Sequence, residues 1–248
     1  MRDENKYEAI DNPGHDGGIR TALCAWDDDP AAAKAKYGPI ASWDVSEVTD
    51  MNSLLMHKED FNEDLLRWNV SNVVNMNNMF DGARSFNGDL SCWDVGQVRN
   101  MSCMFDGAFS FNGDLSRWDV GQVESMNFMF SYATSFNGDL SLWDVGQVKH
   151  IYCMFVAATS FNGDLSRWDV GQVKDMSCMF VAATSFNGDL SCWNVSNVRV
   201  MVSMFRDATS YDRQLDGAWS TSTADKTQMF FNSRGTIAGR VIEAGEGT

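Results

Sequence analysis

Aspartates recur in this chain at a fixed interval, and their spacing limits the chemistry they could do. Each follows a repeated stretch that reads FNG in most copies, and the six members of this aspartate ladder are Asp64, Asp89, Asp114, Asp139, Asp164 and Asp189. Such carboxylates could cap backbone amides at turns, stand in water, or bind calcium. Aspartate after Asn-Gly is well placed to accept hydrogen bonds from turn amides, which favours capping. The glycine-rich calcium repeat GGxGxD is absent, so we expect no metal site and no cofactor.

A second set of polar side chains directly follows a repeated tryptophan. Its members are Asp44, Asn69, Asp94, Asp119, Asp144, Asp169 and Asn194. Asp and Asn exchange freely at this position, and both offer a side-chain oxygen to a hydrogen-bond donor. The exchange indicates that the position needs an acceptor rather than a charge.

The element that must position these side chains is a repeat with a period of 25 residues. Each unit reads FNGDLSxWDVGQVxxMxxMFxxATS with small departures, and the units begin near 37, 61, 86, 111, 136, 161, 186 and 211. One unit is too short to bury a core alone, so the units must stack. The expected core ladder is Trp68, Trp93, Trp118, Trp143, Trp168 and Trp193.

The pattern within a unit predicts two short elements. LSRWDV follows an Asn-Gly turn signal and predicts a strand. The 3–4 spacing of apolar residues in VKDMSCMFVAA predicts one or two turns of α- or 3-10 helix. We therefore expect a repeat solenoid of about eight coils over residues 37–235, with a short strand and a short helical segment in each coil.

The ends of the chain depart from the repeat. Residues 18–36 predict a single N-terminal capping helix, with Ile19 and Leu23 on its apolar face. A polar segment, residues 1–17, precedes this helix, and residues 236–248 are expected to form a C-terminal cap and tail. Atypical ends on regular middle units are typical of capped repeat arrays.

The repeated units resemble those of the BspA-like surface proteins, also called the DUF285 or mycoplasma-lipoprotein-type repeat. The resembling core is the run from Trp193 to Val198, WNVSNV, followed by the Met-Phe pair that recurs in each unit. The resemblance covers residues 37–231 and implies a leucine-rich-repeat-like solenoid, often displayed at the cell surface for adhesion or binding. The middle units have Gly121-Gln122 and its copies where Ser-Asn is common in the family.

The residue before each tryptophan changes from unit to unit. It reads Arg67, Cys92, Arg117, Leu142, Arg167 and Cys192. Because it lies between two core residues of the expected strand, its side chain should face outward. Repeat proteins bind partners with such extended surfaces, so we interpret Arg67, Arg117, Leu142 and Arg167 as a binding stripe; a neutral, drifting surface is the alternative.

The chain has six cysteines and no CxxC motif. Cys103, Cys153 and Cys178 share one slot of the repeat, and the last two lie on neighbouring coils at a spacing compatible with a disulfide. The same slot also holds Ser53, so cysteine is not required there, and half-buried free thiols are expected.

Charge and composition exclude several functions. With a net charge of −15, the chain is a poor partner for nucleic acid or an anionic membrane, and its apolar runs are too short for direct membrane insertion. No His aligns with a fixed Ser, Cys or carboxylate, and no glycine loop has the phosphate-binding form, so we expect no enzyme.

These observations favour a non-enzymatic binding or adhesion module whose partner is a protein or a glycan. An intracellular protein scaffold and a flat carbohydrate- or ice-binding array are the alternatives. The family resemblance implies a cell-surface or extracellular location. The polar start MRDENKYEAIDNPGHDGG lacks the apolar core of a signal peptide, so a cytoplasmic location is the alternative.

Overall fold

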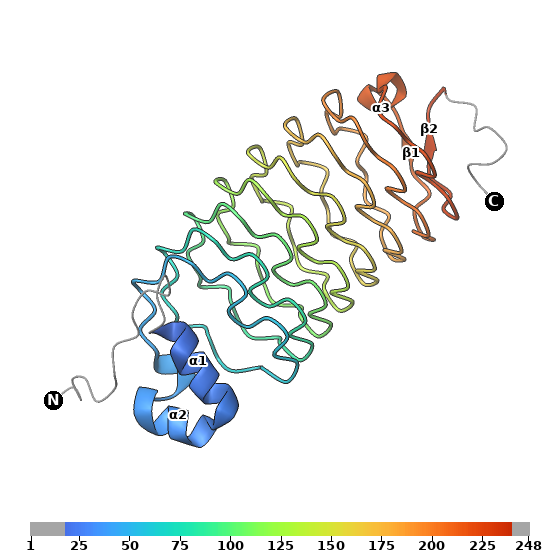
Figure 1. Cartoon of the computed structure of the whole chain (residues 1–248). Coiled ribbons are helices and arrows are strands. Elements are labelled where there is room, and N and C mark those ends of the chain that lie inside the picture. Colours follow the sequence, from blue (N-terminus) through green and yellow to red (C-terminus); the bar gives the residue numbers. More distant parts are fainter. Residues whose placement is uncertain (1–17, 240–248) are drawn as a thin grey trace.

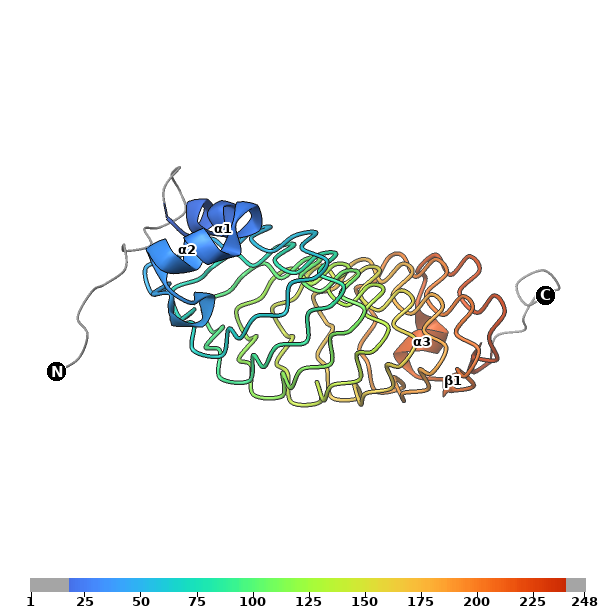
Figure 2. The same ribbon diagram turned by 90° about the horizontal axis from the view of Figure 1, so that it is seen from below.

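Each 25-residue unit of the sequence forms one coil of the chain, and the coils stack along a single long axis (Figure 1). The computed structural model describes residues 18–239. Isolated parallel bridges join positions 25 residues apart, from Asp50 with Asn75 through to Val200 with Asp225. Figure 2, turned by 90°, shows the same arrangement, with helices at one end and a small sheet at the other.

Two helices cover the first coil where the sequence predicts one. Helix α1 spans Ile19–Asp28 and helix α2 spans Pro30–Tyr37. They divide at Asp29, which has extended backbone and whose carboxylate accepts hydrogen bonds from the amides of Ala31 and Ala32. An aspartate N-cap followed by proline at the first helical position starts a new helix, so the expected single helix is wrong.

The remaining regular elements are short. A 3-10 helix, η1, spans Ile40–Ser42, and a one-turn helix, α3, spans Ala218–Thr221. Strand β1, Gln214–Leu215, pairs in parallel with strand β2, Thr236–Ile237. Strand β2 belongs to the expected C-terminal cap; residues 240–248, like the polar segment 1–17, lie outside the described residues.

The expected fold class, a leucine-rich-repeat-like solenoid with a strand and a helical segment in every coil, is wrong. Within residues 18–239 the α-helices lie in the end regions, and the only paired strands are the two residues each of β1 and β2. The repeated coils themselves consist of turns and irregular backbone joined by one bridge residue per coil. LSRWDV, expected as a strand, is irregular backbone with one turn at Ser166 and Arg167, and MSCMF, expected as a helix, is built from turns.

Left-handed backbone explains why the Met-x-x-Met-Phe segment does not form a helix. In the coil that contains Met176, φ is +58° at Cys178 and +54° at Ala182, and the corresponding residues of other coils are also positive. A positive φ at the third position of a four-residue turn is the geometry of a type II turn and interrupts a right-handed helix. Two such turns per coil therefore replace the helical segment.

Backbone hydrogen bonds in this segment alternate between two directions. The amide of Cys178 donates to the carbonyl of Val202 in the next coil at 2.9 Å, whereas the amide of Met179 donates to Met176 in its own coil at 3.3 Å. The amide of Phe180 again donates to the next coil, to Met204 at 2.8 Å. The alternation satisfies the backbone and locks neighbouring coils in register.

The core consists of side-chain ladders that run the length of the stack. Neighbouring tryptophans of the core ladder lie parallel with ring centroids 6.4 Å apart, as in Trp93 and Trp118. Phenylalanines form two further ladders, represented by Phe80 with Phe105 at 5.4 Å and Phe86 with Phe111 at 6.0 Å. All of these side chains are buried, so the repeated apolar letters fill one continuous core.

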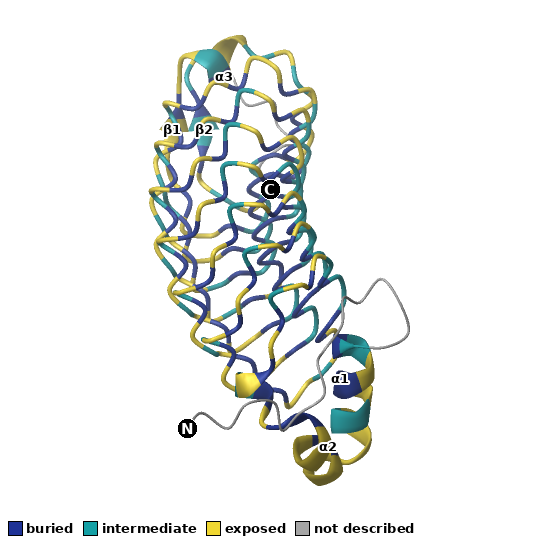
Figure 3. Ribbon diagram, turned by 90° about the vertical axis from the view of Figure 1, so that its left-hand side faces the viewer, coloured by how far each residue is buried: buried dark blue, intermediate teal, exposed yellow. Residues whose placement is uncertain are grey.

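The ring spacings also give the stack its bend. Backbone segments that exchange hydrogen bonds lie about 4.8 Å apart, whereas the tryptophan rings lie 6.4 Å apart. The coils therefore fan out toward the tryptophan side and draw together on the bridged side. Figure 3 shows the resulting bow, with β1 and β2 on its outer edge.

Candidate functional site

The aspartate ladder lies on exposed turns, and each member accepts a hydrogen bond from the amide two residues further on. In Asp114, Oδ1 lies 2.9 Å from the amide nitrogen of Ser116, and the other five aspartates repeat this distance. Hydrogen bonds from the Ser116 backbone and side chain lower the pKa of Asp114. Carboxylates used in this way stabilise turns. Within residues 18–239, no three His, Cys, Asp or Glu side chains gather in a group that could hold a metal ion.

The side chains that follow the tryptophans make the same contact. The Oδ1 of Asp119 accepts a hydrogen bond from the Gly121 amide at 3.0 Å, and that of Asn194 accepts one from Ser196 at 3.2 Å. Asp and Asn thus perform the same task at this position, which needs an oxygen and not a charge.

The binding stripe expected before each tryptophan lies on the outer, tryptophan side of the bow. Arg67, Arg117, Arg167 and Leu142 are all exposed, and Leu142 exposes 73% of its surface. The guanidinium of Arg117 helps to lower the pKa of Asp114, after the hydrogen bonds from Ser116, so it lies beside the aspartate ladder. The stripe is accessible, but neighbouring carboxylates balance part of its charge.

The opposite side of each coil carries a second accessible surface, which was not among the sites expected from the sequence. We call it the bridged face: the exposed and half-exposed side chains of residues 49–59 and of the matching segments 74–84, 99–109, 124–134, 149–159, 174–184, 199–209 and 224–234. These side chains correspond to the letters x in VxxMxxMFxx, which differ from coil to coil. That variation within the chain was the signal that could have identified the face.

Aromatic side chains gather near the middle of the bridged face, on three adjacent coils. We call Phe109, Phe128, Tyr132 and Tyr152 the aromatic group. Tyr132 is 53% exposed and Phe109 is 40% exposed. Phe128 and Tyr152 meet edge to face with ring centroids 5.1 Å apart, a favoured arrangement for two aromatic rings. The group offers a large, partly rigid apolar surface to a partner.

Two carboxylates with raised pKa lie on the same face, one coil apart. Burial raises the pKa of Asp106 to about 6; a hydrogen bond from Ser131 opposes this shift, and the neighbouring carboxylate of Asp81 adds to it. Burial also raises the pKa of Asp81, against the effect of His57. The charge of the bridged face therefore changes in the mildly acidic range.

The repeat seen in the structure agrees with a family match. A family model described as "Mycoplasma protein of unknown function, DUF285" matches residues 30–143 and again residues 133–241. The chain belongs to the DUF285 family. Together the two matches cover helix α2 and all the coils. The resemblance proposed from the sequence is confirmed.

Comparison with curated proteins finds no match to this DUF285 chain. Comparison with solved structures likewise finds none. Within residues 18–239, the longest helix, α1, has only 10 residues, and none is long and apolar enough to cross a bilayer.

All six cysteines of the DUF285 chain are free thiols in this structure. Cys24, Cys92 and Cys192 are exposed, whereas the three that share a repeat slot are half-buried. Burial raises the pKa of Cys103 to about 11 and that of Cys153 to about 12; the adjacent Cys178 thiol contributes to the second shift. Thiols with such pKa values are weak nucleophiles at neutral pH.

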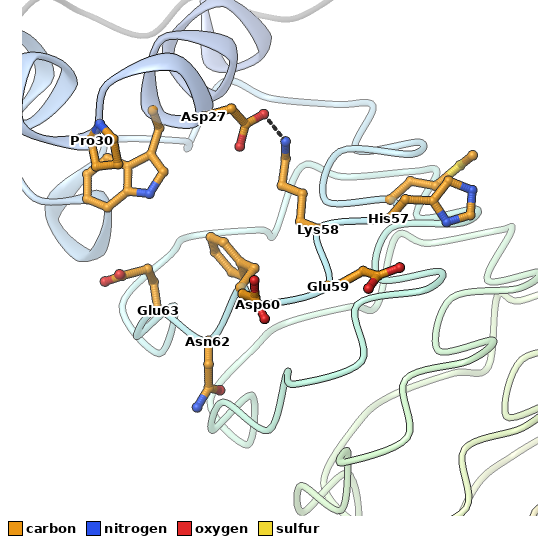
Figure 4. A pocket seen from close by; sticks show the side chains of 11 residues that line it. Asp27, Pro30, His57, Lys58, Glu59, Asp60, Asn62 and Glu63 are labelled. Atoms are coloured by element: carbon orange, nitrogen blue, oxygen red, sulfur yellow. Dashed lines mark hydrogen bonds and ion pairs between the residues drawn. The ribbon is translucent and has the colours of Figure 1, made fainter.

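A cavity of about 580 Å³ lies where the cap helices of the DUF285 chain meet residues 56–63 (Figure 4). Carboxylates line it, and cations pair two of them: Lys58 forms an ion pair with Asp27 of α1, and Arg84 Nη1 lies 3.2 Å from Glu59 Oε2. The Lys58 contact joins the cap to the coils. We therefore interpret this cavity as part of the packing interface between the cap helices and the coils.

Proposed function

We propose that this chain is a non-enzymatic binding module of the cell-surface adhesion type, and that it presents the bridged face to a protein partner. One observation carries the proposal. Apart from the residue before each tryptophan, the side chains that differ between coils lie on one accessible face, while most of those that repeat are buried or hold turns. Repeat proteins use such an extended inner surface for binding, because it can vary without disturbing the core.

The composition of the face supports a protein as the partner. Energetic hot spots of protein interfaces are rich in Tyr, Trp and Arg and lie near the centre of the contact. The exposed rings of Tyr132 and Phe109 occupy that central position on the bridged face. Polar and charged side chains such as Arg84 and Asp106 lie on the coil of Phe109 and the one before it, as in the rim of an interface, whereas the coil after Tyr132 carries the small apolar Val156 and Ala157.

The proposal is tested by capture of a partner with the intact chain and two matched variants. The immobilised chain is exposed to the surface proteins and the lysate of the source cell, and bound proteins are identified by mass spectrometry. Phe109→Ala with Tyr132→Ala alters the bridged face. Arg67→Ala with Arg117→Ala and Arg167→Ala alters the outer stripe and serves as the control. Circular dichroism checks that both variants fold.

We expect the face variant to lose at least about tenfold of the captured partner, since removal of a hot-spot aromatic costs about 2 kcal/mol. The stripe variant should capture as well as the original chain. Loss with the stripe variant alone would move the binding surface to the outer side and overturn the proposal. Recovery of glycans instead of proteins would make the partner a carbohydrate.

The location of the module is tested separately, because an intracellular scaffold could use the same face. Antibody labelling of intact cells should detect the protein if it acts in adhesion. Labelling that requires permeabilised cells would favour the scaffold and would leave the choice of binding face unaffected.

A further inference from the structure

One edge of the bridged face carries a column of cations. It occupies the position just before the bridge residue on the coils between residues 99 and 199, and its members are Arg99, Lys149, Lys174 and Arg199; the same position holds Thr49, Val74 and Ala224 on the coils outside this range. We call this set the cationic column. A single carboxylate, Glu124, interrupts it. The chain as a whole contains 34 acidic and 19 basic residues, so a column in which cations dominate departs from the average surface.

Backbone hydrogen bonds hold the column in place. The amide of Glu124 donates to the Arg99 carbonyl at 2.8 Å, that of Lys149 to Glu124 at 2.9 Å, and that of Arg199 to Lys174 at 2.8 Å. Lys149 and Lys174 are joined through the neighbouring bridge between His150 and Asp175. Successive coils therefore stand about 4.8 Å apart here, the distance between hydrogen-bonded strands. Their side chains reach solvent; that of Arg99 is 60% exposed and that of Lys149 46%.

The charges of the column are incompletely compensated. Glu124 forms ion pairs with two cations: its Oε2 lies 2.7 Å from Lys149 Nζ, and its Oε1 lies 3.8 Å from Arg99 Nη1. Within the described residues, no ion pair or side-chain hydrogen bond involves Lys174 or Arg199. The nearby carboxylate of Asp175 accepts hydrogen bonds from Ser177 in its own turn. Like charges on adjacent coils lie well within the screening length of physiological salt, so a partner that brings carboxylates is favoured.

We propose that an acidic, extended segment of the protein partner docks along this edge, with its carboxylates against Lys149, Lys174 and Arg199 and an apolar side chain against the aromatic group. This inference rests on the proposed function and names the chemistry of the partner. Tyr152 lies three residues after Lys149 on the same coil, and its ring contacts Phe128 of the preceding coil, where Glu124 interrupts the column. A segment that alternates acidic and small residues presents its carboxylates on one side.

The overall charge of the molecule decides between acidic partners. A net charge of −15 repels a polyanion of high charge density at long range. Nucleic acid and anionic membranes bind through many phosphate contacts over a broad basic surface. The cationic column is instead narrow, and three of its cations are consecutive, which matches a short segment with a few carboxylates.

The test uses the full chain and a labelled peptide with glutamate at three alternate positions followed by a tyrosine. The control peptide has glutamine in place of glutamate. Binding is followed by fluorescence anisotropy. The test variant is Lys149→Gln with Lys174→Gln and Arg199→Gln. The matched control, Arg67→Gln with Arg117→Gln and Arg167→Gln, removes the same charge from the outer stripe.

We expect the column variant to weaken binding of the acidic peptide by about tenfold, while the stripe variant binds as the original chain does. The glutamine peptide should bind at least about tenfold more weakly than the glutamate peptide. Equal binding of the two peptides, equal loss in the two variants, or no binding at millimolar peptide would each overturn the inference. Stronger binding of heparin or RNA that depends on the column would overturn it as well, in favour of a polyanion.

The capture experiment separates this inference from the proposed function. Partner capture could depend on Phe109 and Tyr132 but be unchanged in the column variant. In that case the bridged face remains the binding surface, and the inference that an acidic segment docks on the cationic column is wrong. If capture survives both sets of changes, the proposed function fails.

Discussion

The indole N–H of Trp118 donates a 3.0 Å hydrogen bond to the carbonyl of Leu90, which lies in the preceding coil. The same carbonyl accepts the backbone amide of Trp93 within its own coil at 3.1 Å. The relationship recurs along the stack, for example between Trp143 and Leu115. Each tryptophan thus stacks on its neighbour and also ties its coil to the carbonyl of the coil before it.

Replacement of Trp118 by phenylalanine should therefore destabilise the stack. The change removes a buried hydrogen bond, worth about 1 kcal/mol, and leaves a gap in the core ladder that costs about 1–2 kcal/mol more. We expect a total loss of about 2–3 kcal/mol in the free energy of unfolding, measured by urea denaturation. Benzothienylalanine at the same position keeps the volume without the donor and should lose only the hydrogen-bond part. A loss below about 0.5 kcal/mol with phenylalanine would contradict this role.

The core could be predicted from the sequence because burial repeats with the period of the chain. Trp118 and its copies were expected inside, and they are almost fully buried. The backbone could not be predicted in the same way. The 3–4 spacing of Met176, Met179 and Phe180 fits a helix, but two type II turns also bring these side chains to one side. Only the positive φ at Cys178 and Ala182 distinguishes them, and neither residue type signals it.

The left-handed positions give a second prediction. Gly107 has a φ of +65°, and an added Cβ would lie 3.6 Å from its nearest neighbour, the Cα of Gly82, so space is available. Gly107→Ala therefore tests backbone strain alone and should destabilise by about 0.5–1 kcal/mol, after the lower entropy of the unfolded alanine is allowed for. The reciprocal change Ala182→Gly, in the same repeat slot, should be neutral or slightly stabilising. The midpoint of urea unfolding measures both, and a more stable Gly107→Ala variant would refute the strain.

The candidate surface was harder to predict than the core. From the sequence, the expected binding position was the residue before each tryptophan, as at Leu142, because it varies while its neighbours are fixed. The variable residues around Met-x-x-Met-Phe were assigned to a helix. Around a helix their side chains would point in several directions and would not form one face. Because turns and bridges replace that helix, residues such as Phe128 and Tyr152 come to lie on one face.

The raised pKa of Asp106 predicts a pH dependence of stability. Its pKa is about 6 in the folded chain, against 3.8 for an unperturbed aspartate. Between these values the folded state binds more protons than the unfolded state, so the free energy of unfolding rises as pH falls from about 6 to 4. Above pH 6, where Asp106 is ionised in both states, its burial destabilises the fold fully. Asp106→Asn removes the charge and should stabilise the chain at pH 7.5. The expected gain is about 1 kcal/mol, because Asp106 is partly exposed and solvent screens its charge.

The two proteins should become equally stable near pH 4, where the wild-type carboxyl is protonated in the folded state. Thermal unfolding of both between pH 4 and 8 measures the difference. Asp139→Asn serves as the control, because hydrogen bonds from Ser141 lower the pKa of Asp139. That group stabilises the fold above its unfolded pKa and loses this effect as pH falls below about 4. A constant difference between Asp106→Asn and the original chain across the range would refute the assignment.

Cysteine reactivity should divide according to the repeat slots. Alkylation by iodoacetamide requires the thiolate, and burial raises the pKa of Cys153 to about 12 and that of Cys103 to about 11. At pH 8 both should react at least about 50-fold more slowly than exposed Cys92, since burial shields both thiols and their raised pKa leaves very little thiolate. Peptide mass spectrometry over time measures each site, and labelling in urea, where all six should react alike, is the control. Rapid labelling of Cys153 in the folded chain would contradict the prediction, because a buried thiol with a raised pKa should not react quickly.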